Sequence, residues 1–184
     1  MIVNEFSMIT TRVYIGTSLD GFIARKDGSF DWLSKFADGD AVGAYENFMA
    51  GIDVIVIGRH TFETVLDFPA WPYERPVVVL SHTIREVPQR LLENVSLVRL
   101  EPKDLLSELF EKGFRSAYID GGNVIQSFLA DDLVDELIIA RVPVVLGDGI
   151  PLFGYLSHDL EFKHRRTATF SSGLIRSYYT RPRD

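Results

Sequence analysis

The chain contains no cysteine, and this absence excludes a disulfide framework, a thiolate metal site and cysteine catalysis. Histidine is scarce: the four histidines lack the carboxylate spacing of a metal site, and no Ser–His–Asp arrangement stands out. No apolar run approaches the roughly 20 residues that a membrane-spanning helix needs. Residues 1–12 lack the charged start and long apolar core of a signal peptide. We therefore expect a soluble, cytoplasmic protein without a bound metal.

An excess of positive charge is also lacking. The formal net charge is -7, whereas general nucleic-acid binding needs a basic surface, so we expect no nucleic-acid partner. Apolar residues, by contrast, are plentiful: hydrophobic residues make up 46% and aromatic residues 12% of the 184 residues. This composition is typical of a folded globular protein with a substantial core. No repeat, low-complexity tract or linker interrupts the sequence, which predicts a single domain over residues 1–184.

Apolar β-branched runs alternate with helical patterns along the chain. The expected strands span residues 12–18, 22–24, 53–57, 76–81, 95–99, 117–120 and 134–145. The expected helices span residues 40–50, 61–66, 104–112 and 123–130, and residues 31–33 are expected to lie in a loop. Segments 167–170 and 174–180 flank Ser171-Ser172-Gly173, which indicates a hairpin. This order predicts an α/β fold with a parallel central sheet and antiparallel strands at one edge.

Two of the expected strands run into helices through glycine. At the first junction, Gly58 lets the backbone approach a ligand, and Thr61 is a suitable residue for starting the helix. The free N–H groups of the first helical turn, with Arg59 and His60 beside them, would suit a phosphate. A second strand–glycine–helix junction spans residues 117–123. Two such junctions in one small domain indicate a ligand with several phosphates, such as a nucleotide cofactor.

Four segments in this order resemble the dihydrofolate reductase fold. They are residues 18–24 (SLDGFIA), 58–63 (GRHTFE), 120–123 (DGGN), and 134–137 (VDEL) with 143–149 (PVVLGDG). Within that fold, the chain looks most like the stand-alone relatives of the reductase domain of the bifunctional riboflavin-biosynthesis deaminase–reductase. The likeness covers nearly the whole chain and implies a three-layer α/β/α domain that binds NADPH at the carboxyl edge of its sheet. The sequence shows no deaminase zinc motif, so we expect the reductase activity alone.

The resemblance assigns cofactor-binding roles to residues at the ends of the strands. For the phosphates it implies the residues Gly58, Arg59, His60 and Thr61, and beneath the pyrophosphate Gly121, Gly122, Asn123 and Val124. It implies adenosine contacts for Leu80, Ser81 and His82, a 2′-phosphate contact for Arg99, and nicotinamide carboxamide contacts from the backbone at Gly16 and Ile23. It further implies a cis peptide bond within the glycine pair.

The catalytic residues are less clearly indicated. Hydride transfer needs little from side chains beyond alignment of cofactor and acceptor, but a proton must also reach the substrate. Dihydrofolate reductases carry a carboxylate early in the first helix, and the matching position here is Ala37 or Val42, neither of which ionises. The candidates are therefore the nearby Asp31 and Glu46, together with Asp20, which matches the riboflavin-type reductases. Alternatively, Asp20 is a turn residue that caps backbone N–H groups, and Glu46 belongs to the polar face of its helix.

The resemblance implies an NADPH-dependent reductase whose hydride acceptor is like 5-amino-6-(5-phosphoribosylamino)uracil. A phosphoribosyl group needs basic side chains nearby, for which Arg25 and Arg141 are the candidates. The alternatives are a dihydrofolate or other pterin reductase and a non-catalytic nucleotide-binding module. Relatives of this type are often dimers, so we expect a homodimer, with the apolar region 142–156, including Phe153 and Tyr155, as the candidate interface.

Overall fold

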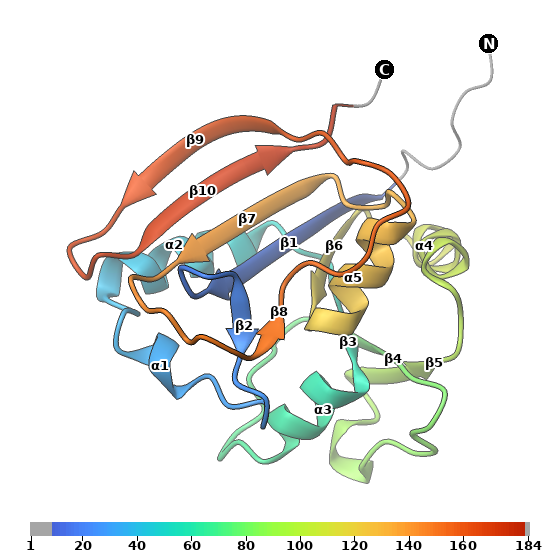
Figure 1. Ribbon diagram of the computed structural model, residues 1–184. Coiled ribbons are helices and arrows are strands. Elements are labelled where there is room, and N and C mark those ends of the chain that lie inside the picture. The colour runs from blue at the N-terminus through green and yellow to red at the C-terminus, as the bar shows by residue number, and fades with distance from the viewer. Residues whose placement is uncertain (1–8, 183–184) are drawn as a thin grey trace.

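Residues 9–182 are described by a computed structural model, in which helices cover both faces of one long twisted sheet (Figure 1). Residues 1–8, most of the segment in which we expect no signal peptide, lie outside the described residues. The order of the main sheet is β5-β4-β3-β6-β1-β7-β10-β9. Its strands are β1 (Thr10–Thr17), β3 (Val54–Gly58), β4 (Val77–Leu80), β5 (Val95–Val98), β6 (Ser116–Asp120), β7 (Glu136–Arg141), β9 (Lys163–Thr169) and β10 (Ile175–Thr180).

The strands from β5 to β7 run parallel, and the hairpin β9–β10 adds two antiparallel strands beside β7. The predicted parallel sheet with an antiparallel edge is thereby confirmed. A second, two-stranded sheet pairs β2 (Phe22–Ala24) with β8 (Ile150–Pro151). This small sheet joins the loop after β1 to the loop after β7, at the carboxyl ends of both strands.

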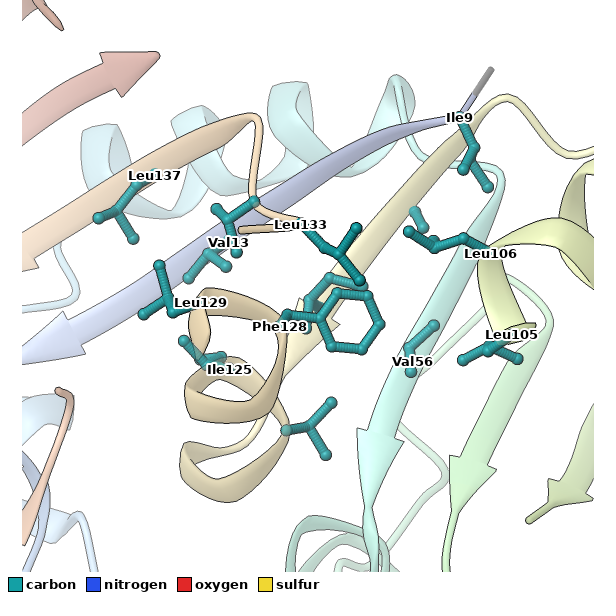
Figure 2. Close-up of a cluster of buried hydrophobic side chains, with 14 of the residues drawn as sticks. Ile9, Val13, Val56, Leu105, Leu106, Ile125, Phe128, Leu129, Leu133 and Leu137 are labelled. Carbon is teal, nitrogen blue, oxygen red and sulfur yellow. The ribbon is translucent and has the colours of Figure 1, made fainter. Parts of the chain in front are cut away.

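The helices are α1 (Asp31–Ser34), α2 (Gly39–Ala50), α3 (Arg59–Leu66), α4 (Pro102–Glu111) and α5 (Gly122–Ala130), with one 3-10 turn, η1 (Gln89–Leu91). Helices α4 and α5 cover one face of the sheet, where Leu105, Ile125 and Phe128 pack against strand residues such as Val13 and Val56 (Figure 2). None of the helices in the described part of the chain is long and apolar enough to cross a membrane.

Helices α2 and α3 cover the opposite face, where Tyr45 and Phe62 pack against Ile55 and Ile57. Strand β3 therefore sends Val54 and Val56 to one helical layer and Ile55 and Ile57 to the other. A strand buried on both faces must be apolar throughout, which explains the unbroken run of β-branched residues at this position. The result is the expected three-layer α/β/α arrangement.

Several boundaries differ from those predicted, three of them for reasons that the packing and backbone contacts show. Residues 31–33 form helix α1 instead of a loop, because Trp32 is buried (4% exposed) in a cluster with Ala140, Val142 and Leu174. Helix α3 begins two residues before the expected residue 61, with Gly58 as its N-cap. Strand β7 ends at residue 141, because the proline at 143 has no N–H with which to continue the ladder after the Val142 N–H has bonded to the Thr17 carbonyl.

The region expected to form a dimer interface follows β7. Val145, Phe153 and Tyr155 are exposed, and the Tyr155 side chain most of all at 89%. Exposed large apolar side chains are typical of interaction surfaces when they cluster. The homodimer stays a prediction.

Candidate functional site

The two glycine junctions meet at the carboxyl edge of the sheet. Strands β3 and β6 are parallel neighbours, so the turns that follow them emerge side by side. Gly121 has a φ of 93°, and a Cβ added there would collide with the Thr61 hydroxyl and lie 3.8 Å from the Gly58 nitrogen. Only glycine permits this backbone conformation and this close approach together.

Both helices that start at these junctions have uncapped N-termini. Gly58 is the N-cap of α3 and Gly121 that of α5, and neither provides a side chain that could accept from the first-turn N–H groups. Neither first turn contains an acidic residue. Two helix N-termini therefore present free N–H groups and partial positive charge next to each other, which is the chemistry that binds a pyrophosphate.

Arg59 and His60 lie in the first turn of α3 with exposed side chains. Arg59 Nη2 is 3.2 Å from His60 Nε2, and the Glu63 carboxylate lies 3.7 Å from Arg59 and 3.8 Å from His60. Exposed ion pairs of this kind contribute little to stability, so both side chains are free to turn toward an anion. Thr61 is the third residue of the helix, and its hydroxyl faces Gly121.

Residues after β4 and β5 form the next part of this edge. Ser81 is buried, and its hydroxyl accepts from the N–H groups of Thr83 (3.2 Å) and Ile84 (3.1 Å), so its side chain shapes the turn. Arg99 Nη2 donates to the Ile84 carbonyl over 3.4 Å and remains exposed beside that turn. His82 is exposed in the same turn. The adenosine and 2′-phosphate contacts expected of these residues stay predictions.

Of the remaining residues predicted to contact the cofactor, Gly16 lies in β1 under Leu33, whereas Ile23, Gly122 and Val124 lie at the N-terminus of α5. A Cβ added to Gly122 would lie 2.9 Å from Ile23 Cδ1, and one added to Gly58 would lie 2.9 Å from Val124 Cγ2. Asn123 is exposed in the first turn of α5, and Leu80 is partly buried at the end of β4. The structure thus brings both junctions, β2 and the end of β4 to one edge of the sheet.

Asp20 holds the loop after β7 in place. Its two carboxylate oxygens accept from Leu146 N (3.1 Å) and Gly147 N (2.7 Å), across more than 120 residues of sequence. Hydrogen bonds from Ser18 first, and then from these N–H groups, lower the pKa of the Asp20 carboxyl to about 2. A carboxylate that stays ionised at neutral pH is a poor proton donor, so these contacts favour the turn-residue interpretation.

The other two predicted catalytic carboxylates are exposed. Asp31 opens α1 and pairs with Arg25 Nε at 3.3 Å. Glu46 lies on the exposed side of α2, whereas Tyr45 and Phe48 pack toward the sheet. Neither position shows the desolvation that usually tunes a catalytic acid. Their catalytic roles stay predictions.

Asp120, at the end of β6, has the desolvated carboxyl group that Asp20, Asp31 and Glu46 lack. The residue keeps some exposed surface, but burial of its carboxyl raises the pKa to about 6, and the hydrogen bond from the Gly121 N–H, together with the nearby Tyr118 hydroxyl, opposes the rise only in part. The Gly121 N–H donates to Asp120 Oδ1 over 2.8 Å. The sequence contained a signal for this acid, namely an ionisable residue between a buried strand and the glycine pair.

Three tyrosines surround this carboxyl on the α2/α3 face of the sheet. They are Tyr45, Tyr73 and Tyr118, and burial raises the pKa of each hydroxyl while the nearby Asp120 charge raises it further. The Tyr118 hydroxyl donates to the Tyr14 carbonyl over 2.9 Å. The acid is thus set among neutral hydroxyl groups and aromatic rings, which suit a flat, uncharged substrate.

Two further expectations were a cis peptide bond within the glycine pair and the absence of a bound metal. Residues 9–182 contain no cis peptide bond, so the cis bond implied within the Gly121–Gly122 pair is wrong. Within the same range, no group of three or more potential ligand side chains is arranged to hold a metal ion.

Known proteins resemble the chain over almost its full described length. The family model described as the RibD C-terminal domain matches residues 10–176. The crystal structure of a candidate riboflavin biosynthesis protein from Shewanella sp. PV-4 has a TM-score of 0.89 and 42% identity, covering 95% of this chain and 100% of that chain. The uncharacterized protein YwjB of Bacillus subtilis is 32% identical over 170 residues, or 91% of this chain and 96% of its own length.

A more distant likeness concerns the fold alone. The structure of a diaminohydroxyphosphoribosylaminopyrimidine deaminase/5-amino-6-(5-phosphoribosylamino)uracil reductase from Thermotoga maritima has a TM-score of 0.76 at 16% identity. The match covers 95% of this chain and 57% of that one.

Proposed function

The chain belongs to the RibD C-terminal domain family, and we propose that it is an NADPH-dependent reductase of a small heterocyclic or ribosylamino substrate. Membership of this family supports an oxidoreductase of the RibD reductase type. The related Thermotoga maritima protein is named as a reductase of 5-amino-6-(5-phosphoribosylamino)uracil. The cofactor and the substrate are our proposal for this chain.

The observation that supports the cofactor best is the meeting of two uncapped, glycine-started helices. The Gly121 backbone lies so close to Thr61 and Gly58 that a single Cβ would fill the space between them. N–H groups of two helix N-termini would donate to the pyrophosphate there, and Arg59 and His60 would supply mobile positive charge. Arg99 would bind the 2′-phosphate that distinguishes NADPH from NADH.

Bound NADPH would supply the hydride, which leaves alignment and proton supply to the protein. Asp120 is our candidate for the proton, because its pKa of about 6 keeps part of the carboxyl population protonated near neutral pH. Its place between the glycine pair and the tyrosines puts it beside both the cofactor junction and the aromatic face. Asp20 would hold the loop after β7 in place.

The candidate residues for a substrate phosphate are Arg25 and Arg141. Arg25 is exposed and paired with Asp31, and Arg141 is exposed at the end of β7. Ala140 pairs with Gly16, and its side chain lies on the α2 face of the sheet, as Asp120 does. Successive side chains of a strand point to opposite faces, so the Arg141 side chain lies on the other face. These positions give a ribosyl phosphate little charge at the tyrosine-lined face.

One observation favours a second candidate, a dihydrofolate or other pterin reductase. Such enzymes need a desolvated carboxyl beside the helix that follows the first strand. Asp120 meets that description, since its charge acts on the hydroxyl of Tyr45 in α2. In this chain, however, the acid comes from β6 and not from the helix itself.

Titration of the protein with NADPH and with NADH, followed by nicotinamide fluorescence, tests the cofactor assignment. We expect NADPH to bind more tightly than NADH, and absence of binding of both would overturn the proposal. Turnover assays with dihydrofolate and with the ribosylaminouracil phosphate then separate the two candidate substrates. Cofactor binding without turnover of either would favour the nucleotide-binding module.

A further inference from the structure

Arg176 of β10 is one of the largest fully buried side chains in the described structure, with 1% of its surface exposed. It pairs across the sheet with Ala140 of β7, which in turn pairs with Gly16 of β1. The three residues form a row on the α2 face, at the carboxyl ends of β1 and β7. Arg176 therefore lies two strands from the glycine expected to contact the nicotinamide.

The guanidinium has too few acceptors for its donors. Its Nη2 donates to the Ala41 carbonyl in α2 over 3.1 Å, whereas Nε and Nη1 have no hydrogen-bond partner within residues 9–182. The rings of Phe170 and Tyr14 lie 4.5 Å and 5.1 Å from the guanidinium carbon. Cation–π contacts of this kind offset only part of the cost of removing a charged group and its N–H donors from water.

Its surroundings offer few acceptors. Trp32 packs in the same cluster as Ala41 and Ala140, and its indole Nε1 is also buried without a partner among the described residues. The N-terminal half of α2 contributes positive, not negative, partial charge. Burial raises the pKa of the Tyr14 hydroxyl to about 12, while the Arg176 charge and a hydrogen bond from Arg176 oppose that rise, which leaves Nε and Nη1 as the donors without a partner among the described residues. The missing component is an acceptor.

We propose that Arg176 is a substrate-binding residue, whose free N–H groups donate to acceptor oxygens of the hydride acceptor next to Gly16. The inference rests on the proposed reductase function and identifies which end of the substrate is recognised. Between Arg176 and β1 the row carries only the methyl group of Ala140 and no side chain at Gly16, over which Leu33 of α1 packs. A carbonyl-bearing ring or a carboxylate would satisfy the same donors.

Binding of two probes in the presence of NADP⁺ tests this role: uracil, which carries ring carbonyls, and benzoate, which carries a carboxylate. Affinities are measured by NMR titration of the wild-type protein and of Arg176→Met, which replaces the charge with an apolar chain of similar length. We expect at least one probe to bind the wild type and to lose about 10- to 100-fold in affinity in the variant. The probe affected shows which oxygen chemistry the site takes.

Arg166→Met is the matched control, because Arg166 also stacks on a tyrosine of the hairpin, 3.7 Å from the Tyr178 ring, but is exposed. It should leave probe affinity unchanged. NADPH affinity should stay the same in both variants. If Arg176→Met does not fold, the Arg176 Nε–H resonance of the wild type provides the readout, and it should shift when the probe is added.

The outcomes separate this inference from the cofactor proposal. Equal probe affinity in the wild type and Arg176→Met would overturn the inference and indicate a purely structural arginine, even if NADPH binds. Failure of both probes to bind the wild type, or an unmoved Nε–H resonance, would count against it equally. If the wild type binds a probe but no NADPH, and Arg176→Met loses the probe, the result would support the Arg176 site. It would overturn only the cofactor assignment.

Discussion

Leu33 of α1 lies directly over the backbone of Gly16 at the end of β1: a Cβ added to the glycine would come within 2.5 Å of Leu33 Cδ2. Because Gly16 is the expected contact of the nicotinamide carboxamide, Leu33 takes up space that the cofactor ring would need. Binding of the ring at Gly16 would therefore require α1 to shift, and the energy of that shift would weaken the apparent affinity.

Leu33→Ala removes the obstructing side chain, so NADPH affinity should rise, by about three- to tenfold. Nicotinamide fluorescence titration measures the change. Leu92→Ala is the control, since Leu92 is half exposed beside η1 and should not affect binding. A weaker or unchanged NADPH affinity in Leu33→Ala would mean that Leu33 does not occupy the ring's place.

Gly121→Ala tests the meeting of the two junctions. The new Cβ would collide with the Thr61 hydroxyl at a φ of 93°, so we expect the variant to lose about 1–3 kcal/mol of stability and at least tenfold in NADPH affinity. Gly113→Ala is matched for backbone strain, having the same φ but no atom within 4 Å of the added Cβ. Chemical denaturation and cofactor titration should show a stability loss in both variants and an affinity loss in Gly121→Ala alone.

Arg99→Ala tests the proposed 2′-phosphate contact. NADPH affinity should fall about tenfold while NADH affinity stays unchanged, because only NADPH carries the second anion. Arg90→Ala removes an exposed arginine from η1 and controls for the general change in charge. A preference for NADPH that persists in Arg99→Ala would remove this residue from the site.

Patterns that depend on burial were well predicted from the sequence. The β-branched run in β3 is apolar because both helical layers contact it, and consecutive apolar residues in the sequence indicate this burial directly. Helix α1 could not be predicted in this way, since its single turn depends on Trp32 packing against Ala140 and Val142, more than 100 residues away. Four residues contain too little periodicity to indicate a helix.

In the candidate site too, local features could be predicted from the sequence and features that depend on distant residues could not. Glycines that start helices mark the cofactor edge locally, so Gly58 and Gly121 could be found from the sequence. The environment of an acid depends on distant residues: Asp20 meets backbone N–H groups at 146 and 147, and the tyrosines near the desolvated Asp120 include Tyr45 and Tyr73 from other segments. Arg176 gave no sequence signal, because its burial follows from strand register between β7 and β10.

Asp20→Ala should free the loop that contains Leu146 and Gly147. Both N–H groups would lose their acceptor, so their hydrogen exchange should speed up about tenfold or more while the core strands exchange as before. Asp27→Ala is the control, since Asp27 accepts from the Ser29 N–H within its own turn. Unchanged exchange at residues 146 and 147 would refute the clamping role.

Asp120→Asn should change how stability depends on pH. The carboxyl has a pKa of about 6 in the folded protein against a reference of 3.8, so the native state holds a proton that the unfolded chain has released between pH 4 and 6. The unfolding free energy of the wild type should therefore fall as pH rises through this window, by up to about 3 kcal/mol from this residue. Asparagine cannot ionise, so the variant should lack this fall and be the more stable protein at pH 8.

The same substitution should reduce turnover if Asp120 supplies the proton. Loss of a positioned general acid lowers the rate by about 100-fold or more, while NADPH binding should persist because the backbone N–H groups remain. Wild-type turnover should decline as pH rises above 6, and the residual activity of Asp120→Asn should not follow that decline. Asp131→Asn, on the exposed end of α5, controls for the lost charge. If Asp120→Asn is more stable but keeps full activity, Asp120 does not supply the proton.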